Sequence, residues 1–141
     1  MYTKHHLLVS LVIGVAVVAI APPPISPLLV VAAAVVVGVS IDLDHFLLAR
    51  YNAGDWRALR ESAADPRPLL FEQDAVFEDG EVGAVPRLVT HLLLTAALIL
   101  LALPLVPYLA VVIGVVLFAH VVADVVWDFT GLLGPAHART G

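Results

Sequence analysis

Four long runs of apolar residues dominate the chain, and short proline-containing breaks or one long polar segment separate them. The runs cover residues 7–21, 27–41, 88–106 and 108–126. None of them carries the charged face that a helix on the surface of a soluble protein needs. A helix requires about 20 mostly apolar residues to cross the hydrocarbon core of a bilayer. The pattern therefore predicts four transmembrane helices.

Prolines mark the breaks between consecutive runs. Residues 22–24 are all proline and end the first helix, whereas Pro27 can occupy the first turn of the second. Pro104 and Pro107 make a similar break between the last two runs. We expect two helical hairpins, with helices over about residues 3–21, 27–48, 88–106 and 108–128.

The long polar segment, about residues 49–87, is predicted to be a loop that carries one short helix. Gly54 and Asp55 offer an N-cap to this helix, which continues through Trp56, Leu59 and Arg60. The prolines at 66 and 68 and the acidic run 72–81 are expected to be solvated loop.

The composition fits a membrane protein of one domain. Of 141 residues, 61% are hydrophobic and only 13% are charged, which lies outside the range of soluble proteins. The fold class expected is an all-α integral membrane four-helix bundle. No cysteine is present, so a metal site would have to use histidine and carboxylate. The net charge of -5 and the lack of a basic surface argue against a nucleic-acid partner.

The basic residues give the orientation. All of them flank the same side of the predicted helices, and the two proline breaks carry none: Lys4, Arg50, Arg57, Arg60, Arg67, Arg87 and Arg139. Because basic residues concentrate on the inner side of a membrane, both termini and the long loop are predicted to be cytoplasmic. The expected location is the cell membrane, with several passes.

Histidines and aspartates occur at one depth of all four helices. A rise of about 1.5 Å per residue places each of them near the cytoplasmic end of its helix. The candidate metal ligands are His6, Asp42, Asp44, His45, His91, His120 and Asp124. Ionisable residues inside a membrane usually have a function, and this set suits one or two divalent ions, such as zinc, manganese or iron. Asp44 is the candidate for a catalytic base or bridging group, or for a residue that orients a ligand histidine.

Less specific interpretations exist for the same residues. A single histidine such as His91 often only hydrogen-bonds a neighbouring membrane helix. Asp42, Asp44 and His45 could form a helix end that reaches water. Asp128, His5 and His137 are predicted to be solvated rather than metal ligands.

The order of these motifs resembles the YdjM-like family of membrane-bound proteins, which are regarded as metal-dependent hydrolases. The resemblance covers nearly the whole chain and rests on four motifs: His6-Leu7-Leu8, Ile41-Asp42-Leu43-Asp44-His45, Arg87-Leu88-Val89-Thr90-His91 and His120-Val121-Val122-Ala123-Asp124. The chain departs from the family pattern where Pro86 replaces a histidine, Leu92 a serine and Ser40 a proline. The resemblance implies a hydrolase that uses the candidate ligands named above.

Two functions from different classes follow as hypotheses. The first is a metal-dependent hydrolase at the cytoplasmic membrane face, with a lipid-like or phosphorylated substrate from the bilayer. The second is a non-catalytic scaffold or accessory subunit, in which the polar cluster or a structural metal holds the helices together. It would associate with a second copy or with a partner membrane protein. A proton or ion carrier ranks last, because its polar residues would extend through the whole membrane depth.

Overall fold

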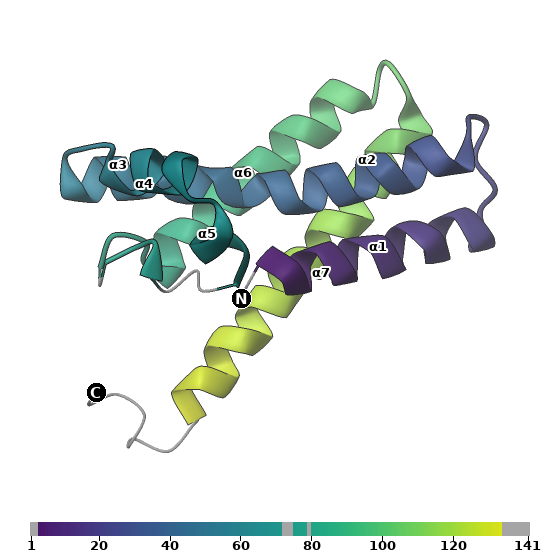
Figure 1. Ribbon diagram of the computed structural model, residues 1–141. Coiled ribbons are helices and arrows are strands. Elements are labelled where there is room, and N and C mark those ends of the chain that lie inside the picture. The colour runs from purple at the N-terminus through teal and green to yellow at the C-terminus, as the bar shows by residue number, and fades with distance from the viewer. Residues whose placement is uncertain (1–2, 72–74, 79, 134–141) are drawn as a thin grey trace.

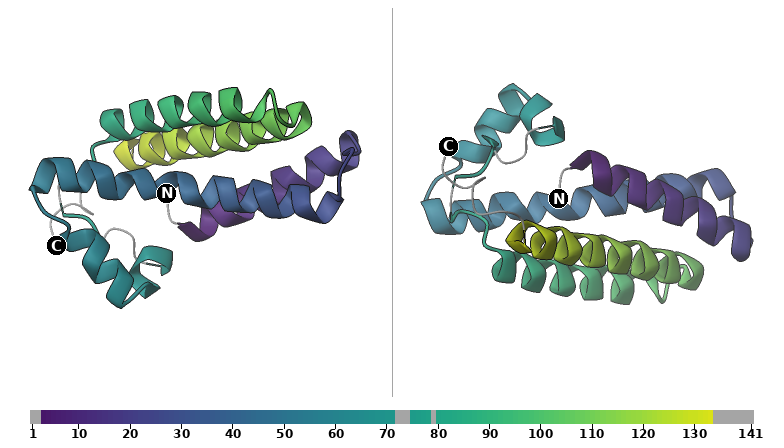
Figure 2. Two further views of the ribbon diagram at one scale, coloured as in Figure 1. Left: turned by 90° about the horizontal axis from the view of Figure 1, so that it is seen from above. Right: turned by 90° about the horizontal axis from the view of Figure 1, so that it is seen from below.

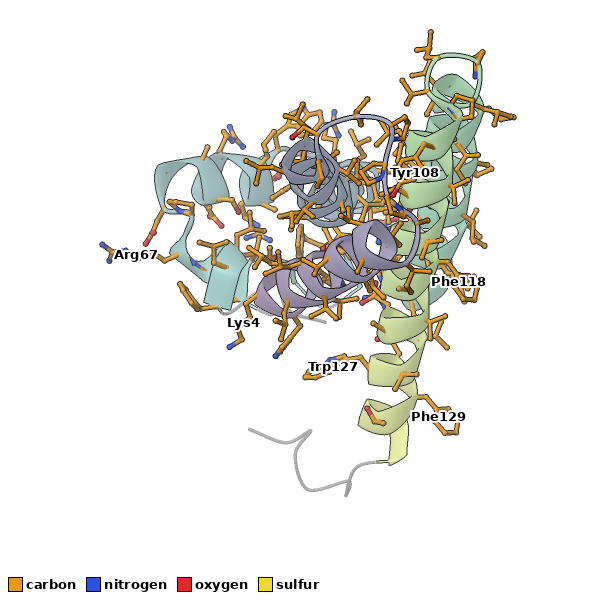
Figure 3. All side chains as sticks on the ribbon, turned by 90° about the vertical axis from the view of Figure 1, so that its right-hand side faces the viewer. Lys4, Arg67, Tyr108, Phe118, Trp127 and Phe129 are labelled. Atoms are coloured by element: carbon orange, nitrogen blue, oxygen red, sulfur yellow. The ribbon has the colours of Figure 1, made fainter. Side chains whose placement is uncertain are left out.

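The computed structural model describes residues 3–71, 75–78 and 80–133, and every regular element within them is helical. Four helices, or runs of helix, are long and apolar enough to cross a membrane: Thr3–Ile20, Pro27–Ala53, Ala84–Ala102 and Pro107–Thr130. Large apolar side chains are exposed along them; Leu28, Leu101 and Phe118, for example, are each more than 60% exposed. Figure 3 shows Phe118 and Phe129 pointing away from the bundle. The prediction of an all-helical fold with four helices that could cross a membrane is confirmed.

The helices pack in a consistent order (Figures 1 and 2). α1 (Thr3–Ile20) packs along α2 (Pro27–Ser40), and α6 (Ala84–Ala102) packs along α7 (Pro107–Leu133). α7 also contacts α1 and α2, so it lies at the centre of the contacts between the helices. Near the two proline breaks, the Tyr108 hydroxyl donates a 2.6 Å hydrogen bond to the carbonyl of Ala21.

Small and β-branched residues fill the space between α2 and α7. Val30, Val112 and Val116 are fully buried there, together with Ala34. Closer to the N-terminal end of α1, Ser10 of α1 lies against Gly38 of α2. A Cβ atom at Gly38 would overlap the Ser10 hydroxyl, so the lack of a side chain permits this close approach.

The second membrane run is longer than the predicted helix 27–48. It continues from α2 through the 3₁₀ turn η1 (Ile41–Leu43) into α3 (Asp44–Ala53). Gly54 ends α3 in a left-handed conformation, with φ of 85°, and its N–H donates to the Arg50 carbonyl. The tighter 3₁₀ turn contains Asp42 and directly precedes Asp44. These candidate ligands therefore lie where the helix changes from α-helical to 3₁₀ geometry. The third membrane helix begins at Ala84, four residues before the predicted start.

The polar segment is folded more closely than predicted. It contains α4 (Arg57–Ala64), the short helix that was expected, and also α5 (Arg67–Phe71), where a loop was predicted. The Asp55 carboxylate accepts a hydrogen bond from the Arg57 N–H at the start of α4. Thr3 of α1 donates its hydroxyl proton to the Leu69 carbonyl of α5, at 2.9 Å, which attaches the segment to the bundle.

The acidic run was expected to be solvated, but its last residue, Glu81, is buried. Only 7% of it is exposed, and it accepts hydrogen bonds of 3.0 Å from Arg57 on both carboxylate oxygens. These hydrogen bonds raise the pKa of Arg57 above its ordinary value. The Glu78 N–H and the Asn52 side chain also bond to Glu81. The residues at 72–74 and 79 lie outside the described part of the chain.

Candidate metal centre

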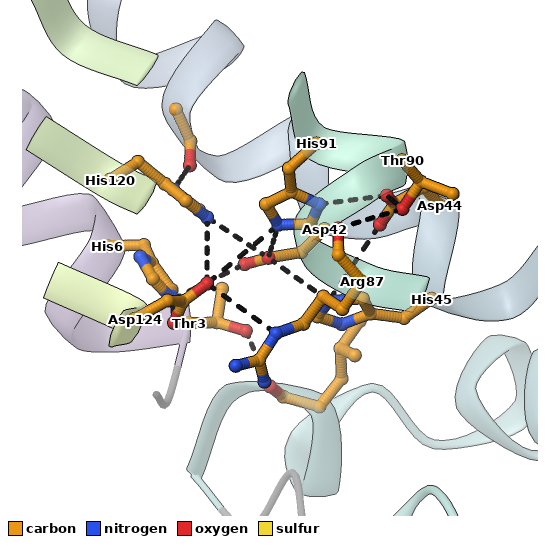
Figure 4. A network of polar contacts seen from close by, with 12 residues as sticks. Thr3, His6, Asp42, Asp44, His45, Arg87, Thr90, His91, His120 and Asp124 are labelled. Carbon is orange, nitrogen blue, oxygen red and sulfur yellow. Dashed lines mark hydrogen bonds and ion pairs between the residues drawn. The ribbon is translucent and has the colours of Figure 1, made fainter. Parts of the chain in front are cut away.

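The seven candidate ligands of the sequence analysis meet inside the bundle, at the end where the polar segment packs. α1 supplies His6, η1 supplies Asp42, α6 supplies His91, and α7 supplies His120 and Asp124. Asp44 and His45 lie in the first turn of α3. All seven are buried. Figure 4 shows their polar side chains converging from helices that are far apart in the sequence.

Four of these residues form the first possible metal-binding set: His6, Asp42, His120 and Asp124. One ligand atom from each lies within 4.8 Å of all the others. His6 Nε2 is 3.3 Å from Asp124 Oδ1, and His120 Nε2 is 3.4 Å from Asp42 Oδ1. The imidazoles of His6 and His120 are stacked, with centroids 3.8 Å apart.

A second set shares one residue with the first. Asp42, His45 and His91 also place ligand atoms within 4.8 Å of one another. His91 Nε2 is 3.3 Å from Asp42 Oδ1, and His45 Nε2 is 3.7 Å from the same oxygen. Asp42 therefore lies between two groups of histidines, in a position from which its carboxylate could bridge two ions.

Hydrogen bonds fix the orientation of two imidazoles. His120 Nδ1 lies 2.9 Å from the Gly38 carbonyl oxygen, which can only accept, so Nδ1 carries the proton. His91 Nδ1 lies 2.8 Å from Asp44 Oδ2, and the Thr90 hydroxyl donates to that same oxygen. In the neutral form of each ring the lone pair is then on Nε2, which faces Asp42. A histidine that is oriented through its other nitrogen is typical of metal ligands.

The local sequence explains how these contacts arise. His120 and Asp124 are four residues apart on α7, so they occupy one face of that helix. Gly38 brings α1 close to α2, which carries His6 to within 3.8 Å of Asp42 Oδ2. Asp42 and His45 are three residues apart across the junction of η1 and α3, and they too face the same side.

The spacing of the ligand atoms fits a small divalent ion. Nitrogen and oxygen ligands at about 2.0–2.1 Å from a tetrahedral zinc ion lie about 3.3–3.4 Å from one another. Three nitrogen to oxygen distances reported above have this length, two in the first set and one in the second. Asp42 Oδ2 and His120 Nε2 are buried without a hydrogen-bond partner. Buried lone pairs that face one another need a proton or a cation between them.

The charges of the site also favour a bound cation. Three buried carboxylates, those of Asp42, Asp44 and Asp124, occupy one cluster, and the guanidinium of Arg87 contacts it at a distance of 3.9 Å from Asp124. Arg87 also forms a hydrogen-bonded ion pair with Asp128. Burying this excess of negative charge is costly unless a cation compensates it, either a metal ion or a protonated histidine.

Asp44 differs from the other candidates. It belongs to neither possible metal-binding set, although its Oδ1 is 3.8 Å from His45 Nε2. Its contacts with His91 and Thr90 favour the orienting role that the sequence analysis offered as an alternative. A role for Asp44 as a catalytic base stays a prediction.

Of the residues predicted to be solvated rather than metal ligands, Asp128 belongs to neither set. Its side chain is 34% exposed and pairs with Arg87 between α7 and α6. The His5 ring lies 5.4 Å from the Trp127 ring at the edge of the bundle and belongs to neither set. His137 and Arg139 lie outside the described residues. Sequence reasoning did not assign Gly38 and Thr90 to the site, although Thr90 precedes His91 directly and Gly38 precedes the Asp-x-Asp motif by four residues.

The polar segment covers the site. Phe77 lies edge-on to the His45 ring, with centroids 5.9 Å apart. The apolar cluster that holds this cover in place consists of Phe46, Ala49, Ala58 and Val76. On this side of the site, Phe77 therefore shields the His45 ring.

Comparison of the chain with protein-family models, with curated proteins and with solved structures finds no match. The resemblance to the YdjM-like family therefore stays a prediction.

Proposed function

We propose that this protein is a membrane-bound hydrolase that depends on divalent metal ions. The observation that carries the proposal is the pair of buried ligand sets that share Asp42, with histidine nitrogens and carboxylate oxygens close enough together to hold an ion. A purely structural network would more often pair each imidazole N–H with its own acceptor. Zinc suits this nitrogen and oxygen ligand set best, and manganese and iron are alternatives.

A bound divalent ion lowers the pKa of a water molecule and polarises a phosphoryl or acyl oxygen of a substrate. The residues of the chain itself position this chemistry. Asp44 and the Gly38 carbonyl orient His91 and His120, and Phe77 shields the His45 ring. The hydrolase class itself rests on the resemblance to the YdjM-like family, together with this site.

The proposed topology is two helical hairpins with both termini in the cytoplasm. The arginines support it, because Arg50, Arg57 and Arg67 belong to the helices around the site, whereas the turns near Ala21 and Val106 carry no basic residue. In this orientation the site lies at the cytoplasmic membrane face. A substrate could then enter from the inner leaflet.

Two adjacent histidines of α1 provide the test. His6 belongs to the first ligand set, whereas His5, one position earlier, does not. Elemental mass spectrometry on detergent-purified protein should find about one or two metal ions per chain in the wild type and in His5→Ala. It should find a clear loss in His6→Ala. Hydrolysis of p-nitrophenyl phosphate should follow the metal content and should stop when a chelator is added.

The second candidate function is a membrane scaffold, since the polar cluster links α1, η1, α6 and α7 and would hold these helices together even without an ion. It predicts a different result in the same experiment. All three proteins would fail to hydrolyse p-nitrophenyl phosphate, whether they are free of metal after reconstitution with zinc, manganese or iron or hold a purely structural ion. His6→Ala would lose thermal stability rather than activity, and that outcome would replace the hydrolase proposal.

A further inference from the structure

A groove runs between α6 and α7 and ends at the candidate metal centre. Its volume is about 250 Å³. Apolar side chains form most of its length, including Leu88, Val121, Val125 and Phe129. Its polar atoms come from Arg87, His91, Asp124 and Asp128. Because His91 and Asp124 also belong to the site, the groove connects the site with the outer surface of the bundle.

The groove opens towards the surroundings of the membrane-spanning helices. Val125 and Phe129 on its rim are 49% and 60% exposed, and Val85 is 72% exposed. The helices that form it, α6 and α7, are both long and apolar enough to cross a membrane. An opening with such a rim faces lipid rather than water, so the molecule that enters it from the side is an apolar chain.

Arg87 determines the chemistry expected at the inner end. Its side chain, one turn of α6 before His91, is only 15% exposed, and it lies between the groove and the site, where its guanidinium contacts Asp124 and Asp128. A guanidinium has five N–H donors in a planar fork, a geometry that suits the oxygens of a phosphate. Asp128 accepts one of these donors.

We propose that the groove binds one hydrocarbon chain of a membrane lipid that bears a terminal phosphate, and that it places the phosphate beside Arg87 and His91. This inference rests on the proposed function and names its substrate class. In the reaction, the oxygen of a water molecule bonds to phosphorus and the bond from phosphorus to the lipid oxygen breaks. The lipid oxygen receives a proton from that water, which gives a lipid alcohol and inorganic phosphate.

Two neighbouring valines of α7 provide a matched pair of variants. Val125 lines the groove, whereas Val126 is similarly exposed, at 55%, and does not line it. Val125→Trp should fill the groove, and Val126→Trp should add the same indole to the face of α7 outside it. The probe is phosphatidic acid with a photoreactive group in its acyl chain, mixed into vesicles that contain the purified protein. Labelled peptides are then mapped by mass spectrometry.

We expect wild type and Val126→Trp to be labelled on α6 and α7, and Val125→Trp to lose about tenfold or more of the labelling. Equal labelling of the two tryptophan variants would overturn the proposal. The circular dichroism and thermal unfolding of Val125→Trp, compared with those of the wild type, serve as the check that it has folded. If that variant fails to fold, competition on the wild type decides: unlabelled phosphatidic acid should reduce the labelling, and phosphatidylcholine should not. Equal competition by the two lipids would overturn the proposal.

The experiments distinguish failure of the lipid-binding proposal from failure of the hydrolase proposal. In one outcome, Val125→Trp removes the specific labelling, but the wild type holds no metal and hydrolyses nothing. That outcome would support the lipid site and contradict the catalytic proposal. Chelator-sensitive hydrolysis of p-nitrophenyl phosphate, with equal labelling of the two tryptophan variants, would contradict the lipid site alone.

Discussion

The two ends of the helical bundle are built on different principles. Near the proline breaks, buried apolar residues such as Val30, Val112 and Val116 form the core between α2 and α7. At the other end, α1, η1, α3, α6 and α7 bring histidines and aspartates into contact. Within a bilayer, apolar side chains gain little by leaving lipid, so the first end depends on close packing. The second end depends on charge balance, because its buried carboxylates need a metal cation or protonated histidines to compensate their negative charge.

Gly38 lies at the boundary between the two ends. Its missing side chain makes room for Ser10, and the nearest atoms to a Cβ there also include Val116 of the apolar core. Its carbonyl oxygen accepts the hydrogen bond that orients His120. Close helix packing on one side of this residue thus supports the geometry of the polar site on the other.

The largest effect should come from removal of a ligand at the polar end. Asp42 belongs to both metal-binding sets and His120 to the first. Asp42→Ala and His120→Ala should therefore lose bound metal while they still insert into the membrane. Elemental mass spectrometry beside the wild type measures this loss. Unchanged metal content in both variants would show that the polar end is only a packing network.

A smaller effect is expected from the residue that orients His91. Asp44→Asn keeps the size of the side chain but weakens its hydrogen bond with His91 Nδ1. Loss of such an orienting partner typically lowers metal affinity by about 10–100-fold. Titration with a competing chelator gives the affinity, and Asp55→Asn, in the polar segment, is the control. Complete loss of metal in Asp44→Asn would instead make Asp44 a direct ligand.

The smallest effect should appear at the apolar end. Val116→Ala would leave a small cavity in a fully buried position and should cost about 1 kcal/mol of stability, with the metal content unchanged. Thermal unfolding in detergent measures the change. Val111→Ala on the same helix is the control, because Val111 is 61% exposed. If Val116→Ala also released the metal, the two ends would be coupled rather than independent.

The amino-acid sequence determined the class of the molecule and the depth of its polar residues. A helix rises by a constant amount per residue, so the distance of His91 or His120 from the end of its apolar run follows directly from counting. Hydropathy likewise revealed the four helices that could cross a membrane, since the bilayer requires long apolar segments. These two regularities were sufficient to predict which residues converge.

The tertiary structure decided how the residues within that layer are paired. The rotation of each helix about its axis and the approach of its neighbours depend on packing, which no local pattern of residues records. For this reason only the fold showed three hydrogen bonds. They join His91 to Asp44, Arg87 to Asp128, and His120 to the Gly38 carbonyl. The burial of Glu81 was missed for the same reason: its partner Arg57 is 24 residues away, and only the folded segment brings them together.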